Sequence, residues 1–169
     1  MTTIAWDGRT LAADSQSNLN GAVCSLKEQK IFKPFSGEEW KVYGETVLAI
    51  GVSGDCGAEC ELIDALSGAG LDYKTQFQPS FDFAALLIVS AERVYVVAKD
   101  EDKTAPAISP QFGAYAIGSG AMIARTAMHL GKRAIEAVQT AIEMDLYTGG
   151  DISSFSVEQA PFIIVKNQE

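Results

Sequence analysis

The chain has 169 residues, 47% apolar and 21% charged, a composition typical of a folded globular domain and not of a disordered segment. Its 13 basic and 22 acidic residues give a formal net charge of −9, which repels the phosphates of nucleic acids. No apolar run reaches membrane-spanning length, and the start lacks the pattern of a signal peptide. We therefore expect one domain over residues 1–169, in the cytoplasm, with no nucleic-acid or membrane partner.

The first third of the chain is predicted to consist of short strands. Strands over Thr2–Trp6 and Arg9–Asp14 flank Asp7-Gly8, which is a tight-turn signal, so the two strands are expected to form a hairpin. A turn-rich stretch covers Ser17–Gly21. Further extended segments are expected over Ala22–Leu26, Lys30–Phe35 and Val47–Val52.

The middle of the chain changes to helical spacing and then returns to strands. Apolar residues recur at this spacing from Ala58 to Leu66, which predicts a helix with Asp55 as its N-cap and an end at Gly68. Two apolar strands follow over Phe83–Val89 and Arg93–Ala98. Lys99–Thr104 is then expected to be a charged loop.

The last third predicts a strand, a helical region and further strands. Tyr115–Ile117 runs into Gly118-Ser119-Gly120, Ala121–Met144 reads as two helices broken at Gly131, and strands are expected over Phe155–Val165. Grouped strands and grouped helices favour antiparallel sheets over alternating βαβ units. We therefore predict an α+β fold with two stacked antiparallel sheets and helices on the outside.

Two familiar enzyme patterns fit this sequence poorly. Gly118-Ser119-Gly120 resembles the start of a dinucleotide-binding fingerprint, but Ile123 stands where a third glycine is needed, and no βαβ unit surrounds it. A serine hydrolase would need His129, the single histidine, as its base. The pattern places His129 in the middle of a helix, and no G-x-S-x-G motif is present.

The three cysteines do not indicate a disulfide framework or a metal site. Their odd number suits a reducing compartment. Cys56 and Cys60 stand four residues apart, but no second pair of ligands accompanies them. We expect both to be buried as small apolar side chains. No metal or cofactor is predicted.

Thr2 offers a different chemistry. A small second residue permits removal of Met1, and Thr2 would then carry both a hydroxyl and a free α-amine. The unperturbed pKa of an α-amine is near 8, so it can act as a general base at neutral pH without a histidine. A nearby lysine would keep this amine neutral, an aspartate would anchor the lysine, and a backbone N–H would stabilise the oxyanion.

Six segments, in order, resemble the HslV peptidase and the proteasome β subunits. They are Thr2-Thr3-Ile4, Ala13-Asp14-Ser15-Gln16, Lys30-Ile31, Ile50-Gly51-Val52-Ser53-Gly54, Ala116-Ile117-Gly118-Ser119-Gly120 and Met144-Asp145-Leu146-Tyr147-Thr148-Gly149-Gly150. The order and approximate spacing of these matches hold over nearly the whole chain. The resemblance implies an N-terminal-nucleophile hydrolase with a four-layer αββα sandwich.

The resemblance also implies a role for each matching position. Thr2 corresponds to the nucleophile, Lys30 to the lysine that tunes it and Asp14 to the aspartate that pairs with the lysine. Gly51 stands where the family supplies its oxyanion N–H. Ser119, Asp145 and Thr148 match the group that supports the terminal amine. The substrate pocket would be lined by Glu28, Phe32, Ala49 and Ser53.

The function implied is that of a threonine-type endopeptidase that acts on polypeptides. Small Ala49 leaves room for a large substrate side chain, and acidic Glu28 either attracts a basic one or is a solvated surface charge. The family forms homo-oligomeric rings, in stacked pairs, that are fed by an ATP-dependent unfoldase. A catalytically silent protein of the same fold, serving as an oligomeric shell or binding module, is the alternative, because the match after Gly51 is incomplete.

The helical region adds a local indication of assembly, because it carries apolar residues on more than one face. Ile123, Ala127 and Leu130 are assigned to the core of the subunit. Met122, Met128 and Ala134 are left for contacts with neighbouring subunits.

Overall fold

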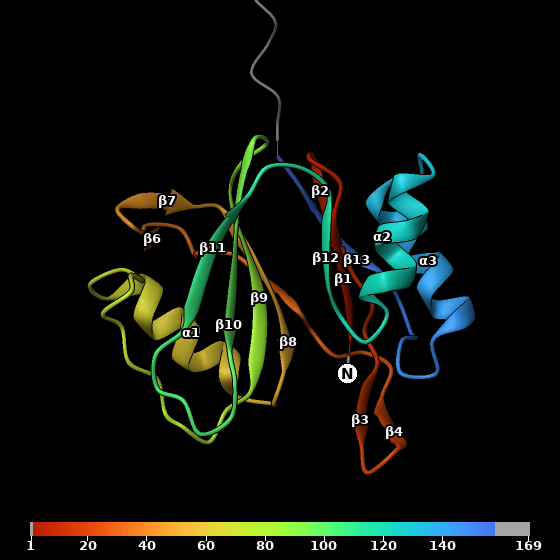
Figure 1. Cartoon of the computed structure of the whole chain (residues 1–169), viewed down its shortest axis with the longest axis horizontal. Coiled ribbons are helices and arrows are strands. Elements are labelled where there is room, and N and C mark those ends of the chain that lie inside the picture. The colour runs from red at the N-terminus through yellow and green to blue at the C-terminus, as the bar shows by residue number, and fades with distance from the viewer. Residues whose placement is uncertain (1, 158–169) are drawn as a thin grey trace, which may run out of the picture.

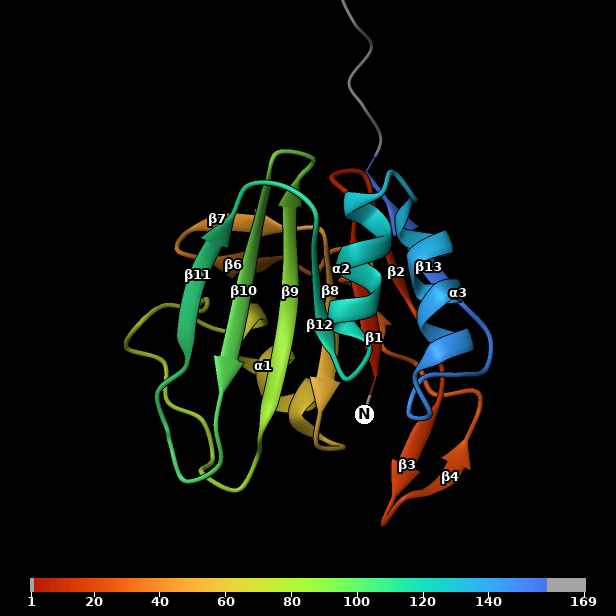
Figure 2. The ribbon, with the colours of Figure 1, turned by 45° about the vertical axis from the view of Figure 1, so that its right-hand side comes forward.

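The computed structural model describes residues 2–157, and these form an α+β fold of antiparallel sheets with three helices (Figures 1 and 2). The larger sheet has five strands in the order β11-β10-β9-β8-β5, and the smaller has four in the order β12-β1-β2-β13. Two additional hairpins, β3-β4 and β6-β7, stand apart from these sheets. The predicted α+β class with antiparallel sheets is confirmed.

The elements have the following bounds. The five-stranded sheet comprises β5 (Ile31–Phe32), β8 (Ala49–Gly54), β9 (Phe83–Ser90), β10 (Arg93–Lys99) and β11 (Ala107–Gln111). The four-stranded sheet comprises β1 (Thr3–Trp6), β2 (Thr10–Ala13), β12 (Tyr115–Gly118) and β13 (Ser153–Ser156). The hairpins are β3 (Ser17–Leu19) with β4 (Ala22–Ser25) and β6 (Trp40–Val42) with β7 (Glu45–Val47). The helices are α1 (Ala58–Ser67), α2 (Ala121–His129) and α3 (Ala134–Met144).

The period of two along the strands divides the apolar residues of β1 and β2 between two cores. Ile4, Trp6 and Leu11 pack toward the five-stranded sheet, where they meet Leu86 and Ile88. The residues between them face α2 and α3. That second core is built mostly of alanine, from Ala5, Ala12, Ala116, Ala124, Ala127, Ala134 and Ala137. These small side chains allow the two helices to lie close to the sheet.

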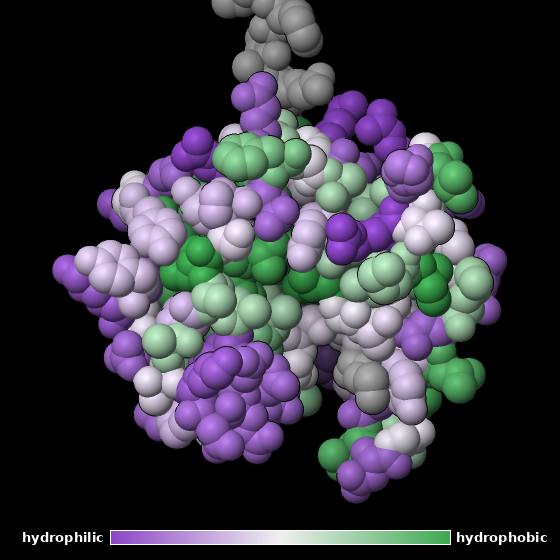
Figure 3. Space-filling view, viewed as in Figure 1, coloured by the Kyte–Doolittle hydropathy of each residue, from purple (hydrophilic) through white to green (hydrophobic). Residues whose placement is uncertain are grey.

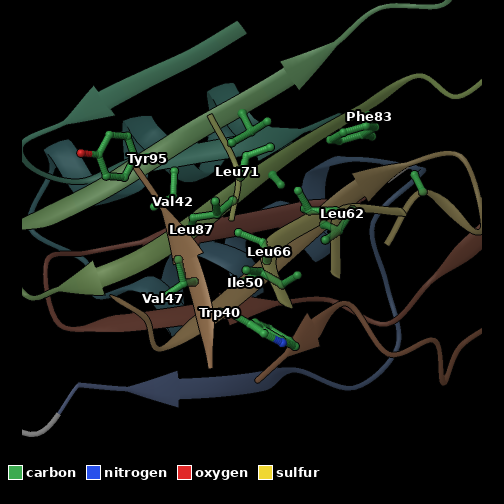
Figure 4. Close-up of a cluster of buried hydrophobic side chains, with 14 of the residues drawn as sticks. Trp40, Val42, Val47, Ile50, Leu62, Leu66, Leu71, Phe83, Leu87 and Tyr95 are labelled. Atoms are coloured by element: carbon green, nitrogen blue, oxygen red, sulfur yellow. The ribbon is translucent and has the colours of Figure 1, made fainter. Parts of the chain in front are cut away.

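A third core lies between the five-stranded sheet and α1 (Figure 4). Leu62 and Leu66 of α1 pack against Ile50 and Leu87 of the sheet, and Trp40 from the β6-β7 hairpin closes one side. The α1 register therefore agrees with the predicted helical spacing. The helix is positioned directly beside β8, the strand that carries Gly51.

Asp7 fixes the β1-β2 hairpin to α3, and its removal provides a first test of the fold. Its Oδ1 accepts hydrogen bonds from the backbone N–H groups of Arg9 at 3.0 Å and Thr10 at 2.8 Å. Its Oδ2 accepts one at 3.0 Å from Ala134 N–H, at the start of α3. Because three donors lose their acceptor, we expect Asp7→Ala to lower the free energy of unfolding by about 1–3 kcal/mol in urea titrations.

Asp151→Ala is the matched control for Asp7→Ala, since Asp151 is an exposed aspartate with the same charge. Its substitution is expected to change stability by no more than about 0.5 kcal/mol. Equal losses in the two variants would show that the Asp7 contacts contribute nothing beyond surface charge.

Several predicted elements differ from the observed ones. The stretch Ser17–Gly21 was predicted to be a turn, but its first three residues form strand β3. The turn is confined to Asn20 and Gly21, both with positive φ. Hairpin β6-β7 and strand β11 were not predicted. Asp55 does not cap α1, because its carboxylate accepts the Asp82 N–H and Gly57 occupies the N-cap position.

Lys99 was assigned to a charged loop, and this assignment is wrong. It is the last residue of β10, it is 1% exposed, and its ammonium is surrounded by main-chain oxygens. Nζ donates hydrogen bonds to the carbonyls of Gln78, Pro79, Asp100 and Lys103. Four acceptors compensate for the loss of water around this cation. Lys99 thereby joins the loops at that end of the five-stranded sheet.

The cysteines and the single histidine also lie elsewhere than expected. Cys56 and Cys60 are exposed, as is Cys24, so the prediction of buried thiols is wrong. His129 is exposed at the last position of α2 and not in the middle of a helix.

The helical region itself is confirmed, with its break at Gly131, but its faces were assigned incorrectly in part. Leu130 is exposed, whereas Met128 and Ala134 are buried in the core under the helices. Met122 is exposed, as predicted.

Among residues 2–157 no helix combines the length and hydropathy needed to cross a membrane. The predicted strands between Phe155 and Val165 extend mostly beyond the described residues, which include β13 and end at Val157.

Candidate active site

Thr2 immediately precedes β1 and lies on the wall of a surface hollow. It is 4% exposed. In the space-filling view the surface is hollowed beside the projecting β3-β4 hairpin (Figure 3). The lining of the hollow next to Thr2 comes from the β2-β3 junction, the segment before β5, the end of β8 and the start of α1. It consists of Thr2, Gln16, Ser17, Asn18, Glu28, Gln29, Lys30, Phe32, Val52, Gly54, Asp55, Cys56 and Glu59.

A buried ion pair between Lys30 and Asp14 lies beside Thr2. Lys30 Nζ is 2.9 Å from Asp14 Oδ1, and it donates a second hydrogen bond of 2.6 Å to the Gln16 carbonyl. Lys30 is held in turn by β8, because its carbonyl accepts the Val52 N–H at 3.0 Å. Burial lowers the pKa of Lys30, while Asp14 and Glu28 oppose that shift. The hollow thus contains a cation with an incomplete hydration shell.

Asp14 is a hydrogen-bonding centre for the backbone around Thr2. It is completely buried. Its Oδ1 also accepts the Thr3 N–H at 2.8 Å, and its Oδ2 accepts the N–H groups of Gln16 at 3.1 Å and Gly149 at 3.0 Å. One carboxylate therefore connects the lysine, the start of β1 and the segment after α3.

Asp145 forms a second group of polar side chains around the start of β1. Its Oδ2 accepts hydrogen bonds from Ser119 Oγ at 2.7 Å and Thr148 Oγ1 at 2.6 Å. Ser119 Oγ also lies 3.4 Å from the Thr2 carbonyl, and the Thr148 hydroxyl lies 2.7 Å from that of Thr3. Burial opposes ionisation of Asp145, but the hydroxyls of Thr148 and Ser119 and the Tyr147 N–H outweigh it and lower its pKa.

The two glycines of Gly118-Ser119-Gly120 are required by contact with Thr2 and Thr3, not by a bound dinucleotide. A Cβ at Gly118, where φ is +93°, would lie 1.9 Å from the Thr2 carbonyl oxygen. A Cβ at Gly120 would lie 2.1 Å from Thr3 Oγ1. Only glycine at both positions allows β12 and the start of α2 to approach the first residues of β1. The motif therefore shapes the wall beside Thr2.

The structure brings six of the residues predicted to be catalytic into one connected region: Thr2, Asp14, Lys30, Ser119, Asp145 and Thr148. The seventh, Gly51, lies in β8 opposite Ile31 and Leu86. A Cβ at Gly51 would lie 2.8 Å from Ile4 Cγ2, so the packing between the sheets requires glycine here.

The residues predicted to contact substrate occupy two different environments. Glu28 and Phe32 line the hollow beside Thr2. Ala49 is fully buried in β8, and Ser53 is nearly buried in the same strand. A Cβ at Gly118 would lie 3.1 Å from Ser53 Oγ, which places Ser53 close to the end of β12.

The sequence did not indicate the part played by Gln16 and Asn18. Gln16 Nε2 donates to Asn18 Oδ1 at 2.8 Å and to the Leu146 carbonyl at 3.1 Å, and Asn18 Nδ2 donates to the Tyr147 carbonyl at 3.3 Å. These amides join the β3-β4 hairpin to the segment that carries Asp145 and Thr148. Side-chain to main-chain contacts over such long sequence separations leave no local pattern.

Within residues 2–157 no group of three or more histidine, cysteine, aspartate or glutamate side chains is placed to hold a metal ion. The chemistry available around Thr2 is that of a hydroxyl, a buried ammonium and two hydrogen-bonded carboxylates. Such an arrangement is suited to nucleophilic attack by the hydroxyl.

Comparison with known proteins gives the fold but no family. No family model and no curated protein sequence matches this chain. Among solved structures, the fold is similar to that of Thiobacillus denitrificans BPH. Its complex with epoxomicin has 20% sequence identity and a TM-score of 0.61, with 95% of this chain and 99% of that chain covered. A second structure of Thiobacillus denitrificans BPH has 19% sequence identity and a TM-score of 0.59, with 95% of this chain and 98% of that chain covered.

Proposed function

We propose that this protein is a threonine peptidase with a proteasome-like, four-layer αββα fold, and that Thr2 is its N-terminal nucleophile once Met1 is removed. The observation that carries the proposal is the position of Thr2. It lies in a hollow between the buried Lys30–Asp14 pair and the hydrogen-bonded Asp145 group. The likeness to a fold that has been solved with epoxomicin bound supports the same assignment.

The proposed reaction begins with addition of Thr2 Oγ to the carbonyl carbon of a peptide bond. The free α-amine of Thr2 takes the hydroxyl proton, a carbon–oxygen bond forms, and the carbonyl oxygen becomes negative. Collapse of this intermediate breaks the carbon–nitrogen bond, and the protonated amine gives its proton to the leaving amine. An ester on Thr2 remains. Water then hydrolyses the ester, with the same amine as base.

Lys30 and Asp145 have separate tasks in this scheme. The Lys30 ammonium lowers the pKa of the neighbouring α-amine, which keeps the amine unprotonated and able to act as a base. Asp14 keeps the ammonium in place. Asp145, with Ser119 and Thr148, orients the start of β1 and offers hydrogen bonds to the amine. We assign contacts with the substrate to Glu28 and Phe32, which line the hollow. The assignments of the oxyanion N–H to Gly51 and of substrate contacts to Ala49 and Ser53 stay predictions from the sequence, because these residues lie within β8 and outside that lining.

Turnover of short fluorogenic peptides by native protein, together with its intact mass, tests the proposal. We expect a mass that lacks Met1 and measurable cleavage. An N-terminus that is blocked in native material, with no cleavage, would contradict it and would support the alternative of a catalytically silent shell or binding module.

We also propose that the protein assembles into a homo-oligomeric ring, in stacked pairs, which receives polypeptides from an ATP-dependent unfoldase. Apolar side chains are exposed along α2 and α3, among them Met122, Leu130 and Met144 (Figure 3). Exposed apolar surface of this kind is typical of subunit contacts.

Light scattering tests the assembly. We expect a mass that is a multiple of 18.0 kDa at micromolar concentration. Met122→Asp should reduce that mass, because a charge on the contact surface opposes association. A monomer near 18.0 kDa would contradict the ring.

A further inference from the structure

The hollow beside Thr2 has an acidic rim. Three carboxylates line it: Glu28 from the segment before β5, Asp55 immediately after β8 and Glu59 from the first turn of α1. The same lining contains a single cation, Lys30. That charge is compensated by Asp14, with which Lys30 forms a buried ion pair. The net charge facing an incoming ligand is therefore negative.

Two of these carboxylates are held in position by the backbone. Asp55 Oδ2 accepts the Asp82 N–H at 2.9 Å, and Glu59 Oε2 accepts the Gly57 N–H at 3.0 Å. Each carboxylate retains a second oxygen that can accept from a ligand. Because their rotamers are already restricted, less side-chain entropy is lost when a cation binds.

Phe32 and Val52 add two apolar side chains to a lining that otherwise consists mainly of uncharged polar residues, among them Gln16, Asn18 and Gln29. A negative rim beside an apolar patch matches a side chain that has an aliphatic stem and a cationic head. Lysine and arginine have this form. Leucine would offer the three carboxylates no cation, and glutamate would be repelled by them.

We infer that the hollow selects substrates with lysine or arginine at the residue whose carbonyl Thr2 attacks, and that Glu28, Asp55 and Glu59 determine this preference. The inference rests on the proposed peptidase function. Cleavage is then expected after lysine and arginine. Glu28 alone was predicted from the sequence to attract basic side chains, and the structure adds Asp55 and Glu59 to the same rim.

Matched substrates test the preference. Fluorogenic peptides that differ only in arginine or citrulline before the cleaved bond have nearly the same shape and differ by one charge. We expect kcat/KM to favour arginine by about tenfold or more, and Glu28→Gln or Glu59→Gln each to reduce that ratio by about two- to fivefold. Glu61→Gln is the charge-matched control. Glu61 lies on α1 but its carboxylate accepts the Gln78 N–H away from the hollow. A ratio near one, or an equal loss in Glu61→Gln, would overturn the inference.

A second readout separates this inference from the peptidase assignment. Cys56 lines the hollow and is exposed, and Cys24 is exposed on β4. Each thiolate attacks the sulfenyl sulfur of a methanethiosulfonate, a disulfide forms, and methanesulfinate leaves. We expect the ratio of cationic to anionic reagent rates to be several times higher at Cys56 than at Cys24, as resolved by peptide mass mapping.

The same labelling is then repeated in Thr2→Ala, with arginine or citrulline peptide present. Protection of Cys56 by the arginine peptide alone supports the inference even if the protein cleaves nothing, in which case only the peptidase proposal fails. Equal rate ratios at the two thiols, or equal protection by both peptides, would overturn it whether or not cleavage is observed.

Discussion

Thr2→Ala is expected to lower kcat/KM for peptide cleavage by at least about 1000-fold, since removal of a nucleophile leaves only the binding contribution to catalysis. The hydroxyl of Thr2 makes no side-chain hydrogen bond among the described residues, so the loss should not arise from unfolding. Initial rates on a fluorogenic peptide measure the effect. Urea titration of the same variant should give a free energy of unfolding within about 1 kcal/mol of the parent.

Thr2→Ser is the matched control, because serine keeps the hydroxyl and is also small enough to permit removal of Met1. It is expected to retain activity well above that of Thr2→Ala. If Thr2→Ala cleaved peptides at the parental rate, another residue would have to be the nucleophile.

Asp14→Asn is expected to be the most destabilising of the substitutions considered, at about 3–5 kcal/mol in the free energy of unfolding. It leaves the buried Lys30 ammonium without its anion. The asparagine amide also cannot accept on both sides, while the parent carboxylate accepts from Lys30 and from the N–H groups of Thr3, Gln16 and Gly149. Urea titration at neutral pH measures the loss.

Lys30→Met is expected to cost less than Asp14→Asn. The Asp14 carboxylate keeps its three backbone donors in that variant. Asp14→Asn instead leaves a buried cation with neutral acceptors only, such as the Gln16 carbonyl. The double variant should be no less stable than Asp14→Asn alone, because it leaves no unpaired cation. Equal losses of unfolding free energy in the two single variants would show that most of the stabilisation comes from the ion pair and not from the backbone hydrogen bonds to Asp14.

Much of the fold followed from periodicity and turn residues. The β-prone segments Thr2–Trp6 and Arg9–Asp14, with the Asp7-Gly8 turn signal between them, predicted the first hairpin. The helix-forming stretch Ala121–Met144, with its break at Gly131, predicted α2 and α3. The α+β class followed from the order of the elements. These features depend on neighbouring residues only, so the sequence contains what is needed to predict them.

The missed elements depend on conformations or contacts that the local sequence does not favour. Hairpin β6-β7 turns at Tyr43 and Gly44, both with positive φ, and tyrosine is an unusual residue for that conformation. Strand β11 contains Pro110, which is tolerated because the strand lies at the edge of its sheet. Buried Lys99 needs four carbonyls, and two of them come from Gln78 and Pro79, which only the folded chain brings close to the end of β10.

The candidate site was predictable as a set of residues but not as a network. Thr2, Asp14 and Lys30 could be proposed together because each matched a motif in order. The long-range bonds from Gln16 and Asn18 to the Asp145 segment, and the contribution of Asp55 and Glu59 to the hollow, depend on tertiary packing. Cys56 is exposed just before Gly57, the N-cap of α1. The local sequence there likewise gives no signal that would distinguish a buried thiol from an exposed one.

Mass mapping of the adduct with epoxomicin tests the central claim most directly. Its epoxyketone is an electrophile that a hydroxyl and an adjacent amine can attack together, and Thr2 offers both groups once Met1 is removed. We expect native protein to lack Met1 and fragment ions to place one adduct on Thr2, with none in Thr2→Ala. An unmodified N-terminal peptide that still begins with Met1, after exposure to excess reagent, would contradict it.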